Sequence, residues 1–296
     1  MMRKAVIDLG TNTFNLLIAD VREKGFELIH SEKDGVALGM GGINQGYLSE
    51  EAFERGIVTL TRFKNTCVQH HVVEIHAIGT SALRGATNAD EFIQKVRRDL
   101  GFDIEIISGL REAQLIYNGV RWSYDFQDPG VIMDIGGGST EFIFADSTGV
   151  HDMISHNIGV SRIYQQFACS DPLTAQDVTT IENWLEERAE GFFEGKQCDL
   201  LIGASGSFET FYELVHLTAF PEKIKSVSVP FDEIVQSLDE IISSTQADRD
   251  KNPWIIPIRK KMAPIAAVKT RWVIRKLQVK KIIISPCSLK EGVLVE

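Results

Sequence analysis

The sequence predicts an α/β protein built from two related lobes. Apolar strand-like segments alternate with helical segments along the 296 residues. Two stretches repeat each other, "DLGTNTFNLLIAD" at residues 8–20 and "DIGGGSTEFIFAD" at residues 134–146. Between them, Asp128–Pro129–Gly130 has the chemistry of a turn. These observations predict a first lobe over residues 1–128 and a second lobe over residues 129–296.

The first half begins with a strand meander and continues as alternating strands and helices. Residues 34–49 are rich in glycine and are expected to form a loop. Ser49 is a helix N-cap, and its helix is expected to run to about His70. The other strands are "KAVIDL", "FNLLIAD", "FELIHS", "VVEIHAIGT" and "FDIEIIS", and the other helices are "NADEFIQKVRRDLG" and "LREAQLIYNGVRWSY".

The second half repeats this scheme. Hairpin strands are expected from Val131 to about Asn157, and Thr174 caps a long amphipathic helix that reaches Phe193. The remaining strands are "CDLLIGAS" and "KKIIIS", and the remaining helices are "SRIYQQF", "FETFYELV", "VPFDEIVQSLDEIISST" and "PIAAVKTRWVIRKLQ".

The composition is that of an ordinary globular protein, with 44% hydrophobic and 24% charged residues. No apolar run approaches 18 residues, and no long apolar segment precedes the first hairpin, so we expect neither a transmembrane helix nor a signal peptide. The four cysteines show no CxxC spacing and are typical of reduced thiols in a cytoplasmic protein. A net charge of −10 argues against general nucleic-acid binding.

One segment departs from this acidic character. Residues 251–290 hold eleven Lys or Arg and no Asp or Glu. Such a segment is either a track for a polyanion or a solvated helix face with Lys269, Arg271, Arg275 and Lys276 turned outward. The sequence does not rank these two interpretations.

The duplicated hairpin tips are the main candidates for a binding site. Three consecutive glycines cost backbone entropy, which is justified where the backbone turns sharply or approaches a ligand closely. A loop of free N–H groups of this kind can bind a phosphate. If both tips face one cleft, their N–H groups and hydroxyls can hold consecutive phosphates from two sides. The predicted phosphate-binding residues are Gly10, Thr11, Asn12 and Thr13 in the first tip, and Gly136, Gly137, Gly138, Ser139 and Thr140 in the second.

An acid precedes each tip, Asp8 in the first half and Asp134 in the second. Two carboxylates beside phosphates would repel them unless a cation lies between. Mg²⁺ is commonly held by one or two carboxylates together with phosphate oxygens and water. The pair therefore predicts a Mg²⁺ site, although a lone Asp at a strand end is more often only a turn cap.

A second repeated motif adds anion contacts. "AIGTSALR" at residues 77–84 resembles "LIGASGS" at residues 201–207, and each has a strand, a small-residue turn and a helix start. Arg84 can neutralise a phosphate, and the turns that hold Ser81, Gly206 and Ser207 open helices that favour anions.

Hydrolysis needs a base to orient water, and two glutamates are placed for this role. Glu112 opens a helix after a strand, and Glu141 follows the glycine-rich turn. The pattern alone does not rank one above the other. The histidines show no HxH or HExxH spacing, so no catalytic role is assigned to them.

The motifs together resemble the exopolyphosphatase / guanosine pentaphosphate phosphatase family of the actin-like ATPase superfamily, in its short two-domain form. The resemblance is carried by "AVIDLGTNTFNLLIAD", "AIGTSALRGATN", "IISGLREAQLIYNGV", "MDIGGGSTEFIF" and "SLKEGVL". It implies two actin-like (ribonuclease H-like) domains, a cleft between them, Mg²⁺ and release of terminal phosphate. It also implies that Glu112 is the catalytic base, that Asp134 and Glu141 lie near the metal with Asp8, and that Arg84 and Arg259 bind substrate.

The chain departs from the family pattern at Asn15, Gly85 and Lys261, which concerns substrate contacts. We expect a Mg²⁺-dependent exopolyphosphatase acting on inorganic polyphosphate. The alternatives are hydrolysis of guanosine pentaphosphate, a non-catalytic sensor of nucleotide or polyphosphate, and a small-molecule kinase of the same superfamily. Neither a membrane nor a specific nucleic acid is an expected partner, and a homodimer is left open.

Overall fold

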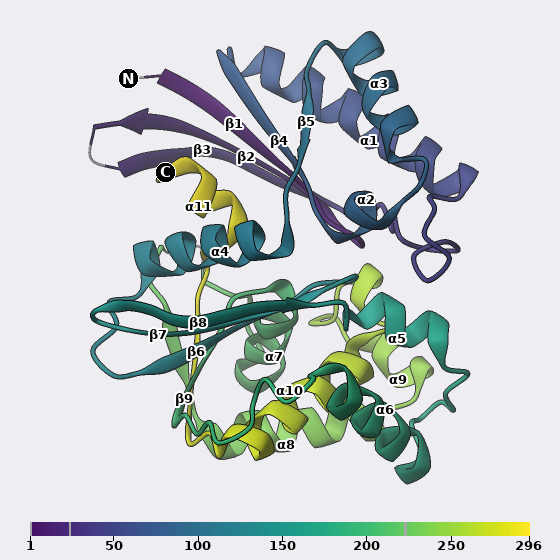
Figure 1. Ribbon diagram of the computed structural model, residues 1–296, viewed down its shortest axis with the longest axis vertical. Helices are drawn as coiled ribbons and strands as arrows, with labels where there is room; N and C mark the ends of the chain where they lie inside the picture. The colour runs from purple at the N-terminus through teal and green to yellow at the C-terminus, as the bar shows by residue number, and fades with distance from the viewer. Residues whose placement is uncertain (1, 24, 222–223) are drawn as a thin grey trace.

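The computed structural model describes residues 2–23, 25–221 and 224–296, and it has two lobes (Figure 1). Each lobe is built on one sheet, the first drawn in the upper part of Figure 1 and the second in the lower part. All strands of the first sheet precede residue 128, and all strands of the second follow it. The predicted α/β class with two related sheets is therefore confirmed.

The first sheet has five strands in the order β3-β2-β1-β4-β5. Strand β1 pairs antiparallel with β2 and parallel with β4, so the hairpin and the following crossover share one central strand. The interior of β1 and of β2 is buried, as their apolar runs require. The strands are β1 (Met2–Leu9), β2 (Phe14–Arg22), β3 (Gly25–Asp34), β4 (Glu74–Gly79) and β5 (Ile104–Ile106).

Three helices pack in the first lobe, α1 (Glu50–Gln69), α2 (Ser81–Gly85) and α3 (Ala89–Leu100). The Ser49 side chain accepts a hydrogen bond from the N–H of Ala52, which confirms Ser49 as the cap of α1. The apolar face of α1 packs with α3 over the sheet. The predicted loop is present over residues 35–49, because Asp34 still belongs to β3, and it lies close to the first hairpin tip.

The second sheet has six strands in the order β10-β11-β9-β6-β7-β8. Its β6–β7 hairpin repeats the β1–β2 hairpin, and parallel β9 stands beside β6 as β4 stands beside β1. The duplication read from the sequence is therefore a duplication of topology. The strands are β6 (Gly130–Ile135), β7 (Thr140–Asp146), β8 (Gly149–His156), β9 (Leu200–Gly203), β10 (Val227–Val229) and β11 (Lys281–Ile284).

The helices of the second lobe follow the predicted pattern with local differences. Thr174 forms a capping box with Asp177 as expected, but the helix ends at Arg188 because turns occupy the residues that follow. The sequence analysis missed β10 and α9, both of which are short. The helices are α5 (Val160–Gln166), α6 (Ala175–Arg188), α7 (Gly206–His216), α8 (Phe231–Ser243), α9 (Gln246–Lys251), the 3₁₀ turn η1 (Pro257–Arg259) and α10 (Ala263–Leu277).

Two helices lie between the lobes, α4 (Gly109–Ser123) and α11 (Leu289–Leu294) (Figure 1). Although α4 belongs to the first half of the chain, its apolar residues Ala113, Ile116 and Val120 join the core beneath the second sheet. Helix α11 ends the second half, yet Leu294 packs against the first sheet. The two halves thus exchange their last helices.

The exchanged helices approach each other closely through two glycines. A Cβ atom on Gly119 of α4 would lie 1.9 Å from the carbonyl oxygen of Ser288, and one on Gly292 of α11 would lie 1.8 Å from the carbonyl oxygen of Leu115. Because backbone stands where a side chain would start, only glycine permits this contact.

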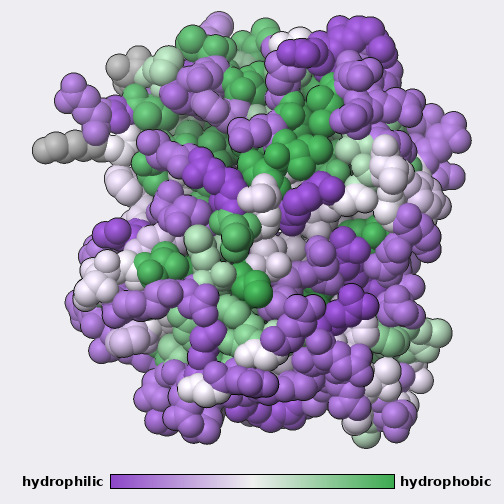
Figure 2. All heavy atoms as spheres, in the orientation of Figure 1, coloured by the Kyte–Doolittle hydropathy of each residue, from purple (hydrophilic) through white to green (hydrophobic). Residues whose placement is uncertain are grey.

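Each lobe has its own core, and hydrophilic side chains cover most of the face seen in Figure 2, with apolar patches mainly in its upper half. In the described part of the chain, no helix combines the length and apolar character needed to cross a membrane.

Candidate active site

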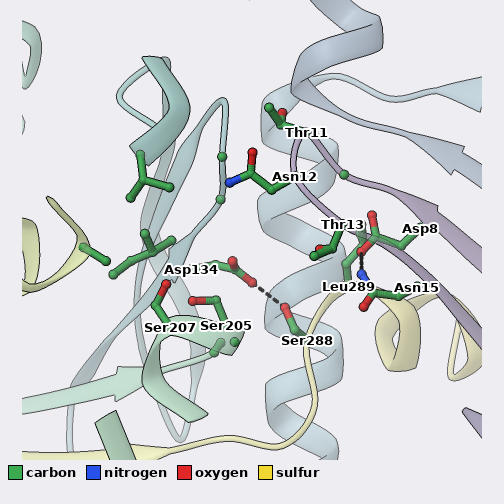
Figure 3. Close-up of a pocket in the computed structure, with 18 of the residues that line it drawn as sticks. Asp8, Thr11, Asn12, Thr13, Asn15, Asp134, Ser205, Ser207, Ser288 and Leu289 are labelled. Atoms are coloured by element: carbon green, nitrogen blue, oxygen red, sulfur yellow. Dashed lines mark hydrogen bonds between the residues drawn. The ribbon is translucent and has the colours of Figure 1, made fainter. Parts of the chain in front are cut away.

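The two glycine-containing hairpin tips line one cavity of about 180 Å³ between the lobes (Figure 3). They also touch each other. A Cβ atom on Gly137 would lie 2.8 Å from Cγ of Asn12, and one on Gly138 would lie 2.7 Å from Oγ1 of Thr11. The glycine run is needed because the first loop packs directly against the second. The predicted convergence of the two tips is found in the structure.

The carbonyl groups of both loops are held by neighbouring segments. Ala37 and Gly39 donate to the carbonyls of Asn12 and Thr11 at 2.8 and 3.0 Å. The N–H groups of Gly159, Val160 and Ser161 bind the carbonyls of Gly138, Gly136 and Gly137. Within the described residues, the N–H groups of Thr11, Asn12, Gly137 and Gly138 have no acceptor in the protein. Free N–H groups at a turn are suited to bind an anion.

Asp8 and Asp134 end the strands before the tips and line the same cavity. Asn15 donates to Oδ2 of Asp8 at 3.0 Å, and the Ser288 hydroxyl donates to Oδ2 of Asp134 (Figure 3). Burial raises the pKa of Asp8 to about 6 and that of Asp134 to about 7. These carboxylates therefore lack enough positive charge around them to stay ionised easily.

Glu112 lies in the first turn of α4, where Ser108 caps the helix, and its carboxylate is buried in the cavity wall. Burial, followed by the charge of Glu141, raises the pKa of Glu112 well above its usual value. Arg84 holds one oxygen, because its Nη1 lies 3.0 Å from Oε2 of Glu112. A buried glutamate that is fixed in this way has the properties of a general base.

Three predicted site residues do not line the cavity. Arg84 donates to Glu112 and to the carbonyl of Ile107. Its guanidinium therefore contacts the predicted base and does not line the cavity. Glu141 is 1% exposed and accepts a hydrogen bond from Ser155 at 2.6 Å. Thr140 is fully buried. In this structure the three lie behind the residues that line the cavity. Their direct contacts with phosphate or metal stay predictions.

The other predicted residues do line the cavity. They are Asp8, Gly10, Thr11, Asn12, Thr13, Ser81, Glu112, Asp134, Gly136, Gly137, Gly138, Ser139, Gly206, Ser207 and Arg259. At the start of α7 a Cβ atom on Gly206 would lie 1.6 Å from Nη2 of Arg259. The glycine therefore gives the guanidinium its place in the cavity wall.

The described residues contain no group of three or more His, Cys, Asp or Glu side chains arranged to hold a metal ion. Mg²⁺ needs fewer protein ligands than this, because one or two carboxylates are enough when phosphate oxygens and water complete its coordination shell. Asp8 and Asp134 are oxygen donors of the right kind, and burial raises the pKa of both carboxyl groups although Lys290 acts against the shift. The donor set fits a Mg²⁺ ion that binds together with substrate.

Three charged residues of the cavity were missed by the sequence analysis, Lys33, Glu209 and Lys290. Oε2 of Glu209 lies 3.1 Å from Nζ of Lys33 in the first lobe and 3.2 Å from Nη2 of Arg259 in the second. Although burial opposes its charge, Lys33 and Arg259 lower the pKa of Glu209 to about 2. This cluster joins the two lobes across the cavity.

Lys290 lies at the same wall, 3.2 Å from Glu291. Burial works against its charge, but Glu291, Glu209 and Asp8 raise the pKa of Lys290 above its usual range. The strand register indicates why Lys33 reaches the cavity. The β2–β3 pairing sets Lys33 opposite Asn15, which itself pairs with Asp8. Lys290 stands in the segment "SLKEGVL" that carries the family resemblance, but no role was predicted for it.

The basic segment of residues 251–290 does not form a continuous track. Arg271 and Arg275 pair with Glu182, Arg271 also pairs with Asp239, and Lys276 pairs with Glu186. Lys269 is fully buried. The structure favours a helix face neutralised by acidic neighbours for Arg271, Arg275 and Lys276, and the outward position that this interpretation gave to Lys269 is wrong.

Comparison with known proteins links this geometry to one family. The model described as the Ppx/GppA phosphatase family matches residues 17–296. A "Bifunctional 3-dehydroquinate synthase/phosphatase" of Fusobacterium nucleatum is 34% identical over 220 residues, which cover 70% of this chain and 33% of the relative. A "Guanosine-5'-triphosphate,3'-diphosphate pyrophosphatase" of Aeromonas salmonicida is 28% identical and covers 98% of this chain and 58% of the relative. The chain therefore spans only part of the length of these relatives, 33% of the first and 58% of the second.

Solved structures match along the whole chain. An exopolyphosphatase from Cytophaga hutchinsonii superposes with a TM-score of 0.95 at 33% identity, covering 99% of this chain and 97% of that one. The Aquifex aeolicus PPX-GPPA enzyme gives a TM-score of 0.82 at 27% identity, with 99% of each chain covered. The fold is therefore the two-lobed, actin-like α/β fold that the sequence resemblance implied.

Proposed function

The chain belongs to the Ppx/GppA phosphatase family, and on this premise we propose that it is a Mg²⁺-dependent exopolyphosphatase that releases orthophosphate from the end of inorganic polyphosphate. One observation carries the proposal. Two loops with free N–H groups meet buried carboxylates in a single cavity. Hydrolysis of a phosphoanhydride needs both parts, donors for the phosphate oxygens and a base for the water.

The loops supply the binding step. In the proposed complex the N–H groups of Thr11, Asn12, Gly137 and Gly138 hold the terminal phosphate from two sides, and Arg259 holds the next part of the chain. Asp8 and Asp134 would hold Mg²⁺, which neutralises phosphate charge and stabilises the leaving oxygen when it is bound. Because the donors are fixed before substrate arrives, little reorganisation is needed in the transition state.

Glu112 supplies the base. Burial raises the pKa of Glu112 well above the usual value of a glutamate, so its carboxylate accepts a proton more readily than an exposed one. Arg84 fixes its orientation through Oε2, which leaves the other carboxylate oxygen for a water molecule. As the new bond to phosphorus forms, the proton of the attacking water passes to Glu112, the bridging P–O bond breaks, and the shortened polyphosphate leaves with the bridging oxygen. The resemblance to the family supports Glu112 over Glu141, and the position of Glu141 outside the cavity lining supports the same choice.

A second substrate has specific support. Two curated relatives carry the name guanosine-5'-triphosphate,3'-diphosphate pyrophosphatase. Guanosine pentaphosphate presents the same terminal phosphoanhydride to the same loops, so the chemistry described above would serve both substrates.

The test is phosphate release from long polyphosphate, short polyphosphate and guanosine pentaphosphate, measured side by side with and without Mg²⁺. We expect the highest kcat/KM with polyphosphate and loss of turnover without Mg²⁺. Higher kcat/KM with guanosine pentaphosphate would favour the second substrate. Tight binding without turnover would favour a sensor, and phosphorylation of an acceptor by ATP would reveal a kinase.

The variant Glu112→Gln tests the base. It should keep substrate binding but lower kcat by about 10²–10⁴-fold, the usual contribution of a positioned base. Glu105→Gln is the matched control, because Glu105 is an exposed glutamate on β5 outside the cavity lining. Equal kcat in the Glu112→Gln variant and the parent protein would remove Glu112 from this role.

A further inference from the structure

Lys269 is the least expected residue of the second lobe. It lies in the middle of α10 with 0% exposure, between the buried residues Val268 and Thr270. Among the described residues, no carboxylate lies within ion-pair distance of its Nζ. A buried ammonium group without an ionic partner costs several kcal/mol. Because an apolar side chain at this position would avoid that free-energy cost, the buried ammonium group is expected to have a specific role.

The hydrogen bonds of Lys269 give that reason. Its Nζ donates to Oγ1 of Thr140 and to the carbonyl oxygen of Ile158. Thr140 begins β7 directly after the second loop, and its hydroxyl in turn donates to the carbonyl of Ser139 at 3.0 Å. Lys269 is therefore connected to the end of the loop through one intervening hydroxyl.

The second bond of Lys269 reaches the support of the loop. Ile158 immediately precedes Gly159, Val160 and Ser161, whose N–H groups bind the carbonyls of Gly138, Gly136 and Gly137 at 3.2, 3.1 and 2.8 Å. These three bonds occupy the loop carbonyls, which leaves the loop N–H groups to the cavity. One ammonium group thus joins the loop to the segment that supports it.

We propose that Lys269 is a positioning residue that holds the Gly136–Thr140 loop in its phosphate-accepting form from behind. It touches neither the cavity nor the substrate. A positive charge at this place also favours an anion on the other side of the loop. Burial lowers the pKa of Lys269, and the nearby charges of Glu141 and Asp134 partly oppose this shift, so that the pKa is about 7.

The first loop differs in this respect. Its carbonyls are supported by Ala37 and Gly39, and in the described residues no buried lysine joins that support to the loop. Among the described residues, a buried lysine that joins a loop to its supporting segment is therefore found only at the second loop. In so far as the ligand is a phosphate, the inference rests on the proposed function.

The test uses the full chain and Lys269→Met, which keeps the length of the side chain and removes its donors. Binding of inorganic orthophosphate with Mg²⁺, measured by calorimetry, should weaken about tenfold, the effect expected when a charged hydrogen-bond donor is lost. In turnover, KM should rise by a similar factor while kcat changes less than about twofold. Thr270→Val is the control, because Thr270 is equally buried but bonds only within α10.

Thr140→Val provides a second route if Lys269→Met does not fold. It should weaken orthophosphate binding in the same direction, and the double variant should bind no worse than Lys269→Met alone, since both remove one connection. Unchanged orthophosphate binding in Lys269→Met or in Thr140→Val would overturn the inference, as would equal weakening in Thr270→Val. The proposed function can fail separately, because weakened binding in Lys269→Met would stand even if the parent protein hydrolysed neither substrate.

Discussion

The two hairpins of the molecule share their geometry and differ in their charge. In the first, strand pairing sets Asp8 opposite Asn15, and in the second it sets Asp134 opposite Glu141. An amide thus stands in one half where a carboxylate stands in the other. The duplication preserved the backbone of the two loops, while the paired positions of the second hairpin hold one carboxylate more than those of the first.

The helices that follow the parallel strands show the opposite asymmetry. In the first half, α2 supplies the cation Arg84, which holds Glu112. In the second, α7 supplies the anion Glu209, which holds Lys33 and Arg259. Arg84 and Glu112 both belong to the first half, whereas Glu209 of the second half pairs with Lys33 of the first, so only this second cluster joins the two halves.

The largest expected effect comes from breaking the exchange of helices between the halves. Gly292→Ala places a Cβ atom against the carbonyl of Leu115, so α11 and α4 must separate. We expect a loss of about 3 kcal/mol in the free energy of unfolding, as for other severe overpacking. Urea denaturation measures it. Gly85→Ala is the control, because its Cβ would approach only Arg162 at 3.8 Å. Equal stability of both variants would mean that the contact is not close.

Asp134→Asn and Asp8→Asn compare the two carboxylates directly. We expect Asp134→Asn to lower kcat/KM by about 100-fold or more and Asp8→Asn by about tenfold, because the carboxylate-rich half supplies most of the charge for Mg²⁺. Kinetics over a range of Mg²⁺ concentrations measure both. Glu141→Gln, which gives the second hairpin the amide of the first, should fall between them. Equal losses for the two Asp variants would mean that charge is shared evenly between the halves.

The pH dependence of stability tests the same asymmetry without turnover. The pKa values of Asp134 and Glu141 are raised to about 7 and that of Asp8 to about 6. Between about pH 4 and pH 7 the folded protein therefore binds more protons than the unfolded chain, so in EDTA these groups lower the stability as pH rises.

The difference between variant and parent protein measures the contribution of Asp134 together with the effect of its charge on the pKa of Glu141. Relative to the parent protein, Asp134→Asn should gain stability steadily from about pH 4 to about pH 7, with a slope below about 1.4 kcal/mol per pH unit. The contribution of His156, whose pKa is lowered by burial, cancels in this comparison. Thermal denaturation in EDTA measures the slope, and parallel curves would mean that Asp134 titrates normally.

The smallest effect is expected at the ion pair between the lobes. Lys33 and Glu209 are partly exposed, so Lys33→Met should cost only about 0.5–1 kcal/mol of stability, less at high salt. Because Lys33 lines the cavity, KM should also rise by about two- to fivefold. Lys4→Met removes an ion pair with Glu74 inside the first lobe and should leave KM unchanged. A change in KM for Lys4→Met alone would contradict this assignment.

The sequence was sufficient for features that are repeated or local. The two loops could be predicted to converge because one motif occurs twice, and Ser49 and Thr174 were identified as caps from the residues beside them. The choice of Glu112 needed the family resemblance, since nothing local separates it from Glu141.

Other features depend on contacts between distant segments. One of the two interpretations of residues 251–290 turned Lys269 outward, but its side chain reaches Thr140 on another element. Glu209 is a single charged residue whose partner Lys33 lies far away in the sequence, and Lys290, although paired with Glu291, owes its place at the cavity to contacts between distant segments. The exchange of α4 and α11 left no pattern in either segment, because each helix is apolar enough to cover either sheet.

The exchanged helices also govern the order in which the protein can assemble during synthesis. The apolar patch around Val6 and Leu17 is covered by Leu294, which the ribosome adds after the whole second lobe. This patch of the first half therefore stays uncovered until the end of the second half has been made. Its open surface is a natural place for a chaperone to bind in the interval.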